Sequence, residues 1–177
     1  MLERLRQLLP PPADPVEPGR PDGWAEVEAA LGTELPSDFK AFTERYGSGT
    51  VDDFLYLFNP FARGQDGNLL VERDRVLAAY RQTRARFPDR LALPPFPEPG
   101  GLLPLGRTDN GDELYWVTDG DPDGWPLALL ESRAALQELH PMPVTEFLAA
   151  LAANQLTSRI LPDDLLDRPS HQFTPLG

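Results

Sequence analysis

The sequence contains no cysteine, which excludes disulfide bridges, thiol nucleophiles and thiolate zinc sites. It also lacks any apolar run near the roughly 18 residues that a membrane-spanning helix needs. Residues 1–9 carry Glu3, Arg4 and Arg6 among leucines, a segment too short and too charged for a signal peptide. We therefore expect a cytoplasmic protein with no membrane segment.

Basic residues are scarce. The chain has 16 Lys and Arg against 28 Asp and Glu, a net charge of −12. This balance argues against nucleic acid and anionic membranes as direct partners and favours a basic protein partner. The charge is uneven, because residues 63–90 hold seven arginines against four acids, whereas residues 98–131 hold eight acids and only Arg107.

Catalytic patterns are also missing. The two histidines, His140 and His171, lie in proline-containing segments without the spacing of a nucleophile and its base, so we expect both on the surface. No glycine-rich phosphate loop follows a strand and opens a helix. The sequence therefore predicts no catalytic residue and no cofactor, and a protein that is not an enzyme.

The length of 177 residues suits one domain with a sizeable core. We divide the chain into an N-terminal helix with a proline-rich lead-in (1–20), the domain itself (21–155) and a C-terminal tail (156–177). Leu165, Leu166 and Phe173 are the residues through which the tail would dock.

The stretch from Gly101 to Glu131 dominates the pattern. Alternating apolar and β-branched residues predict strands over 102–106, 113–118 and 127–130. The turns between them, 109–112 and 119–124, are rich in Asp, Asn and Gly, which suit tight hairpins. We expect this antiparallel meander to form the central sheet of an α+β fold, with helices packed on it.

Apolar spacing predicts helices over 2–9, 23–31, 36–46, 72–87 and 143–153, and a short helical segment within 132–139. A further strand over 50–58 is interrupted at Asp52 and Asp53.

The region from Trp24 to Gly47 and the aromatic strand at Trp116 together resemble the SUKH superfamily, named after the Smi and Knr cell-wall-assembly regulators. The residues that carry this family motif are Trp24, Glu28, Gly32, Leu35, Pro36, Phe39, Tyr46, Gly47 and Trp116. The resemblance covers roughly residues 21–155. It implies a helix-covered antiparallel sheet and assigns these residues mainly structural roles.

Most bacterial members of this superfamily look like immunity proteins, which bind and block a cognate toxin of a contact-dependent or polymorphic toxin system, often a nuclease or a deaminase. The resemblance therefore implies a non-enzymatic toxin-binding protein. The alternative is an intracellular regulatory scaffold or small-ligand sensor of the Smi/Knr type. Neither group is known as a set of enzymes.

Two interpretations of the acidic turns stay open. They can be ordinary solvated hairpins, or they can form a surface that docks the basic groups of a toxin. The candidate partner-binding residues are Asp52, Asp53, Asp109, Asp112, Glu113, Asp119, Asp121 and Asp123.

Two further possibilities carry less weight. The alternating carboxylates from Asp119 to Asp123 resemble a calcium loop, but its twelfth position is Leu130 instead of Glu, so we predict no metal site. A metal-dependent hydrolase using these turns is disfavoured for the same reason.

The arginine-rich helix from Arg73 to Arg90 is expected to be a solvated face. The alternative is that its arginines pair with the acids of a second copy in a homodimer.

Overall fold

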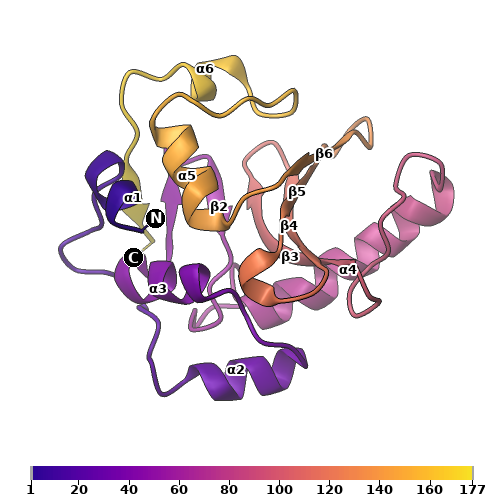
Figure 1. Ribbon diagram of the computed structural model, residues 1–177, viewed down its shortest axis with the longest axis horizontal. Coiled ribbons are helices and arrows are strands. Elements are labelled where there is room, and N and C mark those ends of the chain that lie inside the picture. Colours follow the sequence, from indigo (N-terminus) through magenta and orange to yellow (C-terminus); the bar gives the residue numbers. More distant parts are fainter. Residues whose placement is uncertain (1, 177) are drawn as a thin grey trace.

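The computed structural model describes residues 2–176, which fold around one seven-stranded sheet with the order β6-β5-β4-β3-β2-β1-β7 (Figure 1). All neighbouring strands are antiparallel. The strands are β1 (Gly49–Val51), β2 (Leu55–Leu57), β3 (Gly101–Thr108), β4 (Glu113–Thr118), β5 (Leu127–Leu130), β6 (Gln137–His140) and β7 (Phe173–Pro175). The predicted α+β fold with a mainly antiparallel sheet is confirmed.

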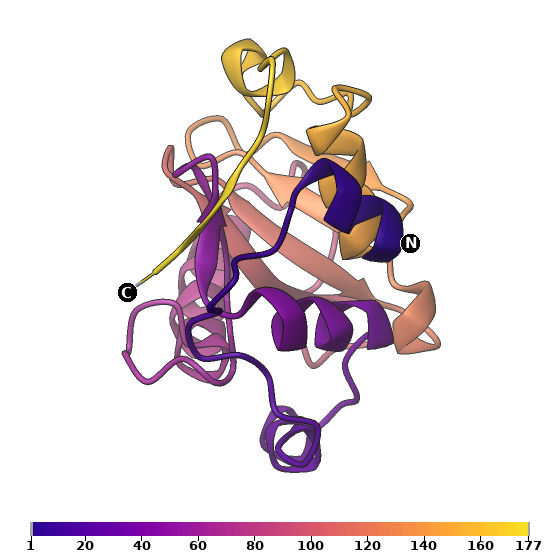
Figure 2. The same cartoon turned by 90° about the vertical axis from the view of Figure 1, so that its left-hand side faces the viewer.

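Helices cover both faces of the sheet. Their bounds are α1 (Leu2–Leu8), α2 (Trp24–Leu31), α3 (Ser37–Tyr46), α4 (Leu69–Arg86), α5 (Val144–Ala152) and α6 (Asp163–Leu166), with a 3-10 turn η1 (Pro122–Gly124). Helices α1, α3 and α5 contact one another in front of the strands in Figure 2, and α4 packs on β3 from behind. Helix α2 contacts α4 below the sheet.

Strand β4 shows why the sheet needs two helical layers. Trp116 points to one face, where its ring meets Phe39 of α3 edge-on at 4.9 Å between centroids. Tyr115 points to the other face, toward Tyr80 of α4 at 5.8 Å. Because successive side chains alternate between the faces and both faces are covered, residues 114–117 are all buried.

The segment 132–139 was predicted to be helical, and that prediction is wrong. Residues 137–140 form the edge strand β6, whose register pairs Leu127 with His140 and Leu130 with Gln137. The segment 137–140 has one apolar residue, Leu139, so its sequence does not tell a strand from a helical turn, and pairing with β5 decides the conformation. His140, expected on the surface, is buried against the ring of Phe147.

Both ends of the chain dock on this core. Leu5 and Leu9 at the N-terminal end are fully buried, and α1 lies on α5. The tail buries Leu161 and Leu165 and then adds β7 beside β1. Between residues 2 and 176, no helix has the length and apolar character required to cross a bilayer.

Candidate partner-binding surface

The two acidic turns of the meander lie at opposite ends of β4. The turn 109–112 precedes Glu113 at one end, and the segment 119–126 follows Thr118 at the other. Consecutive connections of an antiparallel meander must alternate between the ends of the sheet. The eight candidate acids therefore do not share one surface but form two separate groups.

In the first turn, Asp112 is buried and Asp109 is exposed. The Asp112 carboxylate accepts hydrogen bonds from the Thr108 hydroxyl at 2.9 Å and from the Ser132 amide at 3.1 Å. Asp112 thus ties the turn to the loop after β5 and is not available to a partner. Asp109 has no such role and projects from the tip.

Glu113 is partly buried and accepts a hydrogen bond from the Tyr115 hydroxyl. Burial raises the pKa of Glu113 above its usual value, and the Tyr115 hydrogen bond opposes that rise only in part. Burial likewise raises the pKa of Tyr115 well above its usual value. Glu113 therefore belongs to the packing between α4 and the sheet more than to an outer docking surface.

Asp52 was expected on the surface and is instead buried. One carboxylate oxygen lies 2.6 Å from Nδ1 of His171, and the other accepts from the backbone amide of Gln172 at 3.0 Å. Nε2 of His171 lies 3.0 Å from Oδ1 of Asn154. Asp52 and His171, two residues that sequence reasoning placed outside, together anchor the C-terminal tail. Their neighbour Asp53 stays exposed.

The tail brings acidic residues that sequence reasoning did not assign to this end. The C-terminal side of α6 lies beside the β1–β2 turn, because Arg168 approaches Asp52 at 3.5 Å. The β1–β2 turn in turn touches the β3–β4 turn, where the Asp109 amide donates to the carbonyl of Phe54. We call the exposed acids of these three segments the hairpin-end acidic face: Asp53, Asp109, Asp163, Asp164 and Asp167.

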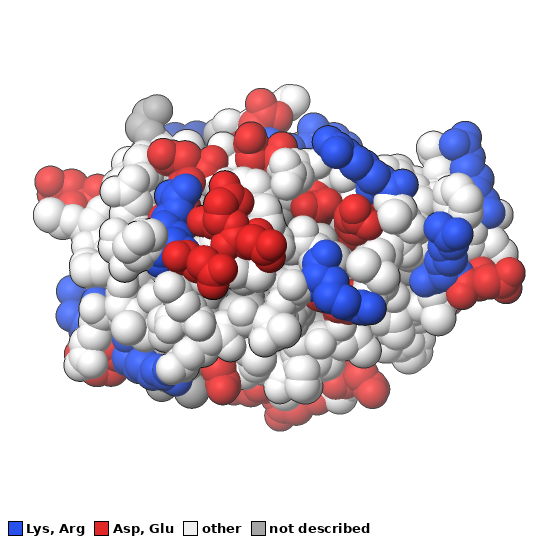
Figure 3. Space-filling view, turned by 90° about the horizontal axis from the view of Figure 1, so that it is seen from above, with Lys and Arg blue, Asp and Glu red and all other residues white. Residues whose placement is uncertain are grey.

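This end of the molecule is the one seen from above in Figure 3, where Asp and Glu side chains gather near the middle with basic side chains around them. In the sequence, Asp163, Asp164 and Asp167 are visible as a small group of acids in the tail. Only the docking of the tail places them near the hairpins.

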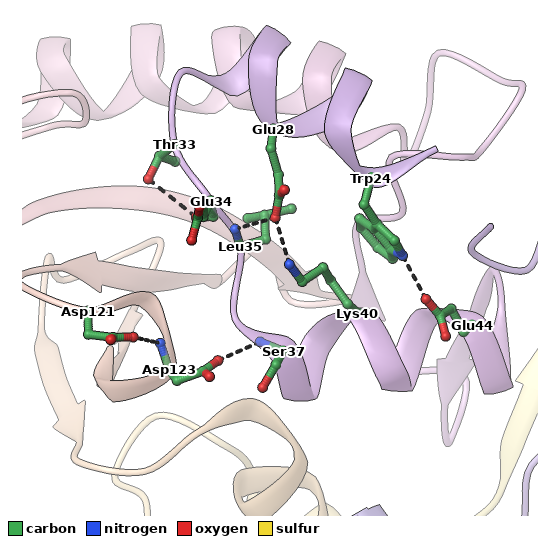
Figure 4. Close-up of polar contacts among 10 residues, drawn as sticks. All are labelled: Trp24, Glu28, Thr33, Glu34, Leu35, Ser37, Lys40, Glu44, Asp121 and Asp123. Atoms are coloured by element: carbon green, nitrogen blue, oxygen red, sulfur yellow. Dashed lines mark hydrogen bonds and ion pairs between the residues drawn. The ribbon is translucent and has the colours of Figure 1, made fainter. Parts of the chain in front are cut away.

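The second group is the η1 acidic turn, formed by Asp119, Asp121 and Asp123, all exposed. Asp121 caps the turn by accepting from the Asp123 amide at 2.9 Å (Figure 4). Asp123 accepts from the Ser37 amide at 2.6 Å, at the start of α3. That hydrogen bond lowers the pKa of Asp123. Within residues 2–176, no group of three or more His, Cys, Asp or Glu side chains is arranged to hold a metal ion.

The family-motif residues lie mainly between the helices and the sheet. Trp24 packs edge-on against Phe61 at 4.8 Å and donates from Nε1 to Glu44 of α3 at 2.8 Å (Figure 4). Trp24 is 6% exposed. It therefore joins α2 to α3 and to the segment after β2.

Glu28 organises the connection from α2 to α3. Its Oε1 accepts from the Leu35 amide at 2.9 Å and from Lys40 Nζ at 2.8 Å (Figure 4). Gly32 ends α2 in the left-handed region at φ 79°, which suits glycine. The spacing of Glu28, Gly32 and Leu35 thus reflects one helix stop and the loop that follows it.

The remaining motif residues fix α3. Pro36 precedes the helix, and Phe39 and Tyr46 on its inner face are buried, as is Trp116 beneath them. The Tyr46 hydroxyl donates to the Leu9 carbonyl at 2.7 Å, which connects α3 to the N-terminal segment. Gly47 has φ 69°, and a Cβ there would lie 2.1 Å from the Val16 carbonyl oxygen, so no other residue fits without movement.

Comparison with known protein families agrees with this arrangement. The profile of the SMI1/KNR4 family (SUKH-1) matches residues 18–127, more than half of the chain. The protein belongs to the SMI1/KNR4 family. The match runs from the lead-in through α2, α3 and the meander to the start of β5. No curated protein and no solved structure matches the sequence.

The SMI1/KNR4 match leaves out α1, β6, α5, α6 and β7. The buried Asp52–His171 pair therefore joins a matched residue to one beyond the match. The tail acids of the hairpin-end acidic face also lie outside the matched region.

A cleft of about 580 Å³ lies between the lead-in, α2 and the segment after β2. Val27, Phe61 and Leu70 provide apolar lining, and Arg20 and Arg63 provide charged groups. Glu17 also lines the cleft, but its carboxylate accepts from the Arg63 amide and the Ser48 hydroxyl. The volume is within the range of small-ligand sites.

Proposed function

We propose that this SMI1/KNR4-family protein is an immunity protein, which acts in the cytoplasm by binding a cognate toxin domain and performs no reaction of its own. The hairpin-end acidic face is the docking surface. The partner is a basic domain of the nuclease or deaminase kind.

Family membership carries the proposal, and the exposed acids support the choice of surface. Asp53, Asp109 and the three tail acids come from three segments that meet at one end of the sheet. They project from ordered hairpins and from a docked helix. Carboxylates in such positions meet the Lys and Arg groups with which nucleases hold phosphates.

The mode of action follows from charge and shape. A net charge of −12 attracts a basic toxin over a distance of about one Debye length, roughly 8–10 Å, and raises the association rate. Once docked, the immunity protein covers the cationic cleft that substrate would enter. Inhibition is then stoichiometric and reversible, without a covalent step.

The deciding experiment starts with a pull-down by the tagged protein from a lysate of its source cells, after which the C-terminal domain of a toxin-like protein recovered there is purified. We expect a one-to-one complex by size-exclusion chromatography and light scattering, and we expect growth of cells expressing the toxin domain to be rescued by this protein. An active toxin that forms no complex and is not relieved would refute the pairing.

The regulatory or sensor alternative has one structural observation in its favour, the cleft between α2 and Phe61. A sensor would bind a metabolite there and would not need a toxin partner. Thermal-shift screening of small metabolites separates the two functions. The sensor function would be favoured if a metabolite raised the thermal midpoint of the wild type but not of Phe61→Ala, and if no toxin complex formed.

A further inference from the structure

The C-terminal half of α4 carries a group of arginines that the proposed function does not use. Arg81 and Arg84 lie one turn apart on the helix and therefore on the same side. Their guanidinium groups reach over to the connector between α4 and β3. Arg81 donates to the Phe96 carbonyl at 3.2 Å, and Arg84 Nε donates to the Leu91 carbonyl at 3.1 Å.

These contacts position the guanidinium groups but do not neutralise them. Within residues 2–176, neither Arg81 nor Arg84 forms an ion pair, unlike Arg73 and Arg75 earlier on the same helix, which pair with Asp74 and Glu72. A guanidinium has five N–H donors, so each side chain keeps donors for a ligand. Their rotamers are already held, which lowers the entropy cost of binding.

Arg81 and Arg84 line a groove of about 440 Å³ between α4 and the connector. Its apolar lining is Ala85, Pro88 and Pro95, and among the described residues Glu98 is the one acid that lines it. Phe87, 45% exposed, follows α4 next to the groove. The groove therefore combines two fixed cations with apolar surface, the combination that suits an acidic peptide with an apolar side chain.

We propose that the groove between α4 and the connector is a second docking site, which binds an acidic peptide segment of a partner protein through Arg81 and Arg84. A peptide fits better than a nucleic acid because the chain as a whole carries a net charge of −12 and repels long polyanions. The positive charge is local: residues 63–90 are the arginine-rich stretch of the sequence. This site is separate from the hairpin-end acidic face and has the opposite charge.

The test measures fluorescence anisotropy of a labelled peptide, Glu-Asp-Glu-Leu-Asp-Glu, with the full-length protein at low salt. An analogue with Gln and Asn in place of Glu and Asp is the peptide control. The first variant is Arg81→Gln/Arg84→Gln. Its matched control, Arg45→Gln/Arg133→Gln, removes the same charge at two exposed positions elsewhere.

Because Arg81 and Arg84 also hold the connector, the first variant could weaken binding by loosening it, and a second variant controls for this effect. Ala85→Glu keeps both arginines with their carbonyl contacts and places a carboxylate of the protein's own in the groove. We expect the acidic peptide to bind the wild type and the matched control alike, and at least about tenfold more weakly to either groove variant. We expect the neutral peptide to bind none of them.

Equal peptide binding by the wild type and the groove variants would overturn the proposal. Full displacement of the peptide by inorganic phosphate, with the ionic strength held constant, would also overturn it, because the groove would then be a site for small anions. A concentration-dependent dimer in sedimentation velocity that is lost in Ala85→Glu would assign the groove to a second copy of this chain instead.

Discussion

At the residue scale, Trp24 shows how a single side chain holds the family core together. Its ring lies between α2, α3 and the segment after β2, and its indole N–H is satisfied by Glu44. Trp24→Ala is expected to lower the free energy of unfolding by about 3–5 kcal/mol, because it removes a buried aromatic side chain and leaves a cavity. Urea denaturation measures the loss.

Trp24→Phe is the matched variant. It keeps much of the apolar packing and removes the hydrogen bond to Glu44, so its expected cost is smaller, about 1–2 kcal/mol. A thermal midpoint unchanged by Trp24→Ala would show that the side chain is not part of the core and would make it a candidate partner-binding residue.

Asp52 is the other residue whose role depends on burial. Its carboxylate meets the His171 ring and the Gln172 amide, both from the tail. Asp52→Ala leaves the buried His171 ring and the Gln172 amide without this acceptor, so we expect a loss of about 1–3 kcal/mol in unfolding free energy and faster proteolysis of the tail. Asp109→Ala, exposed at the neighbouring turn, should change stability by less than about 0.5 kcal/mol. Equal effects of the two substitutions would contradict the anchoring role.

At the scale of elements, the η1 acidic turn stabilises the start of α3. Pro36, which precedes the helix, has no capping side chain, and Asp123 supplies the acceptor from 86 residues further along the chain. Asp123→Ala should cost about 0.5–1 kcal/mol, the lower part of the range for helix caps because the carboxylate is exposed. Asp119→Ala, in the same turn but not bonded to α3, is the control.

The pH dependence of that contact has a defined sign. The pKa of Asp123 is lowered in the folded protein by the Ser37 hydrogen bond, so the contribution is present above the ordinary aspartate pKa. It is lost as the pH falls through the lowered value. The stability difference between wild type and Asp123→Ala should therefore be constant near neutral pH and shrink in the acid range below about pH 4. A difference that grows on acidification would contradict the assignment.

At the scale of the whole molecule, the separation of the acidic groups makes the docking surface testable. The triple reversal Asp109→Lys/Asp163→Lys/Asp167→Lys alters the hairpin-end acidic face, and Asp119→Lys/Asp121→Lys/Asp123→Lys alters the η1 acidic turn by the same charge. If the hairpin-end acidic face docks the toxin, its triple variant should slow association about tenfold or more at low salt. The variant of the η1 acidic turn should slow association much less.

Stopped-flow or surface-plasmon measurements over a salt series distinguish the outcomes. Equal slowing by both variants would mean that only net charge matters. Slowing by the η1 variant alone would move the docking surface to the other end of the sheet.

The sequence by itself determined the family and most of the helices and strands, but not α6, β6 and β7. Strand β4 was predicted within its observed bounds, because its alternating residues face two helical layers and its turns need Asp, Asn and Gly. Helices α2 and α3 followed from apolar spacing with Gly32 and Gly47 as stops. These signals are local, since dihedral preference and side-chain periodicity act within a few residues.

Only the tertiary structure decided which polar residues are buried and which acids lie together. Asp52 and His171 are 119 residues apart, and neither carries a local signal that it will meet the other. Strands β6 and β7 each contain one large apolar residue and no alternation, so they are not recognised without the partners that satisfy their backbone groups. The division of the candidate acids between two ends of the sheet has the same cause: charge can be counted along a chain, but its distribution in space depends on sheet topology and on where the tail docks.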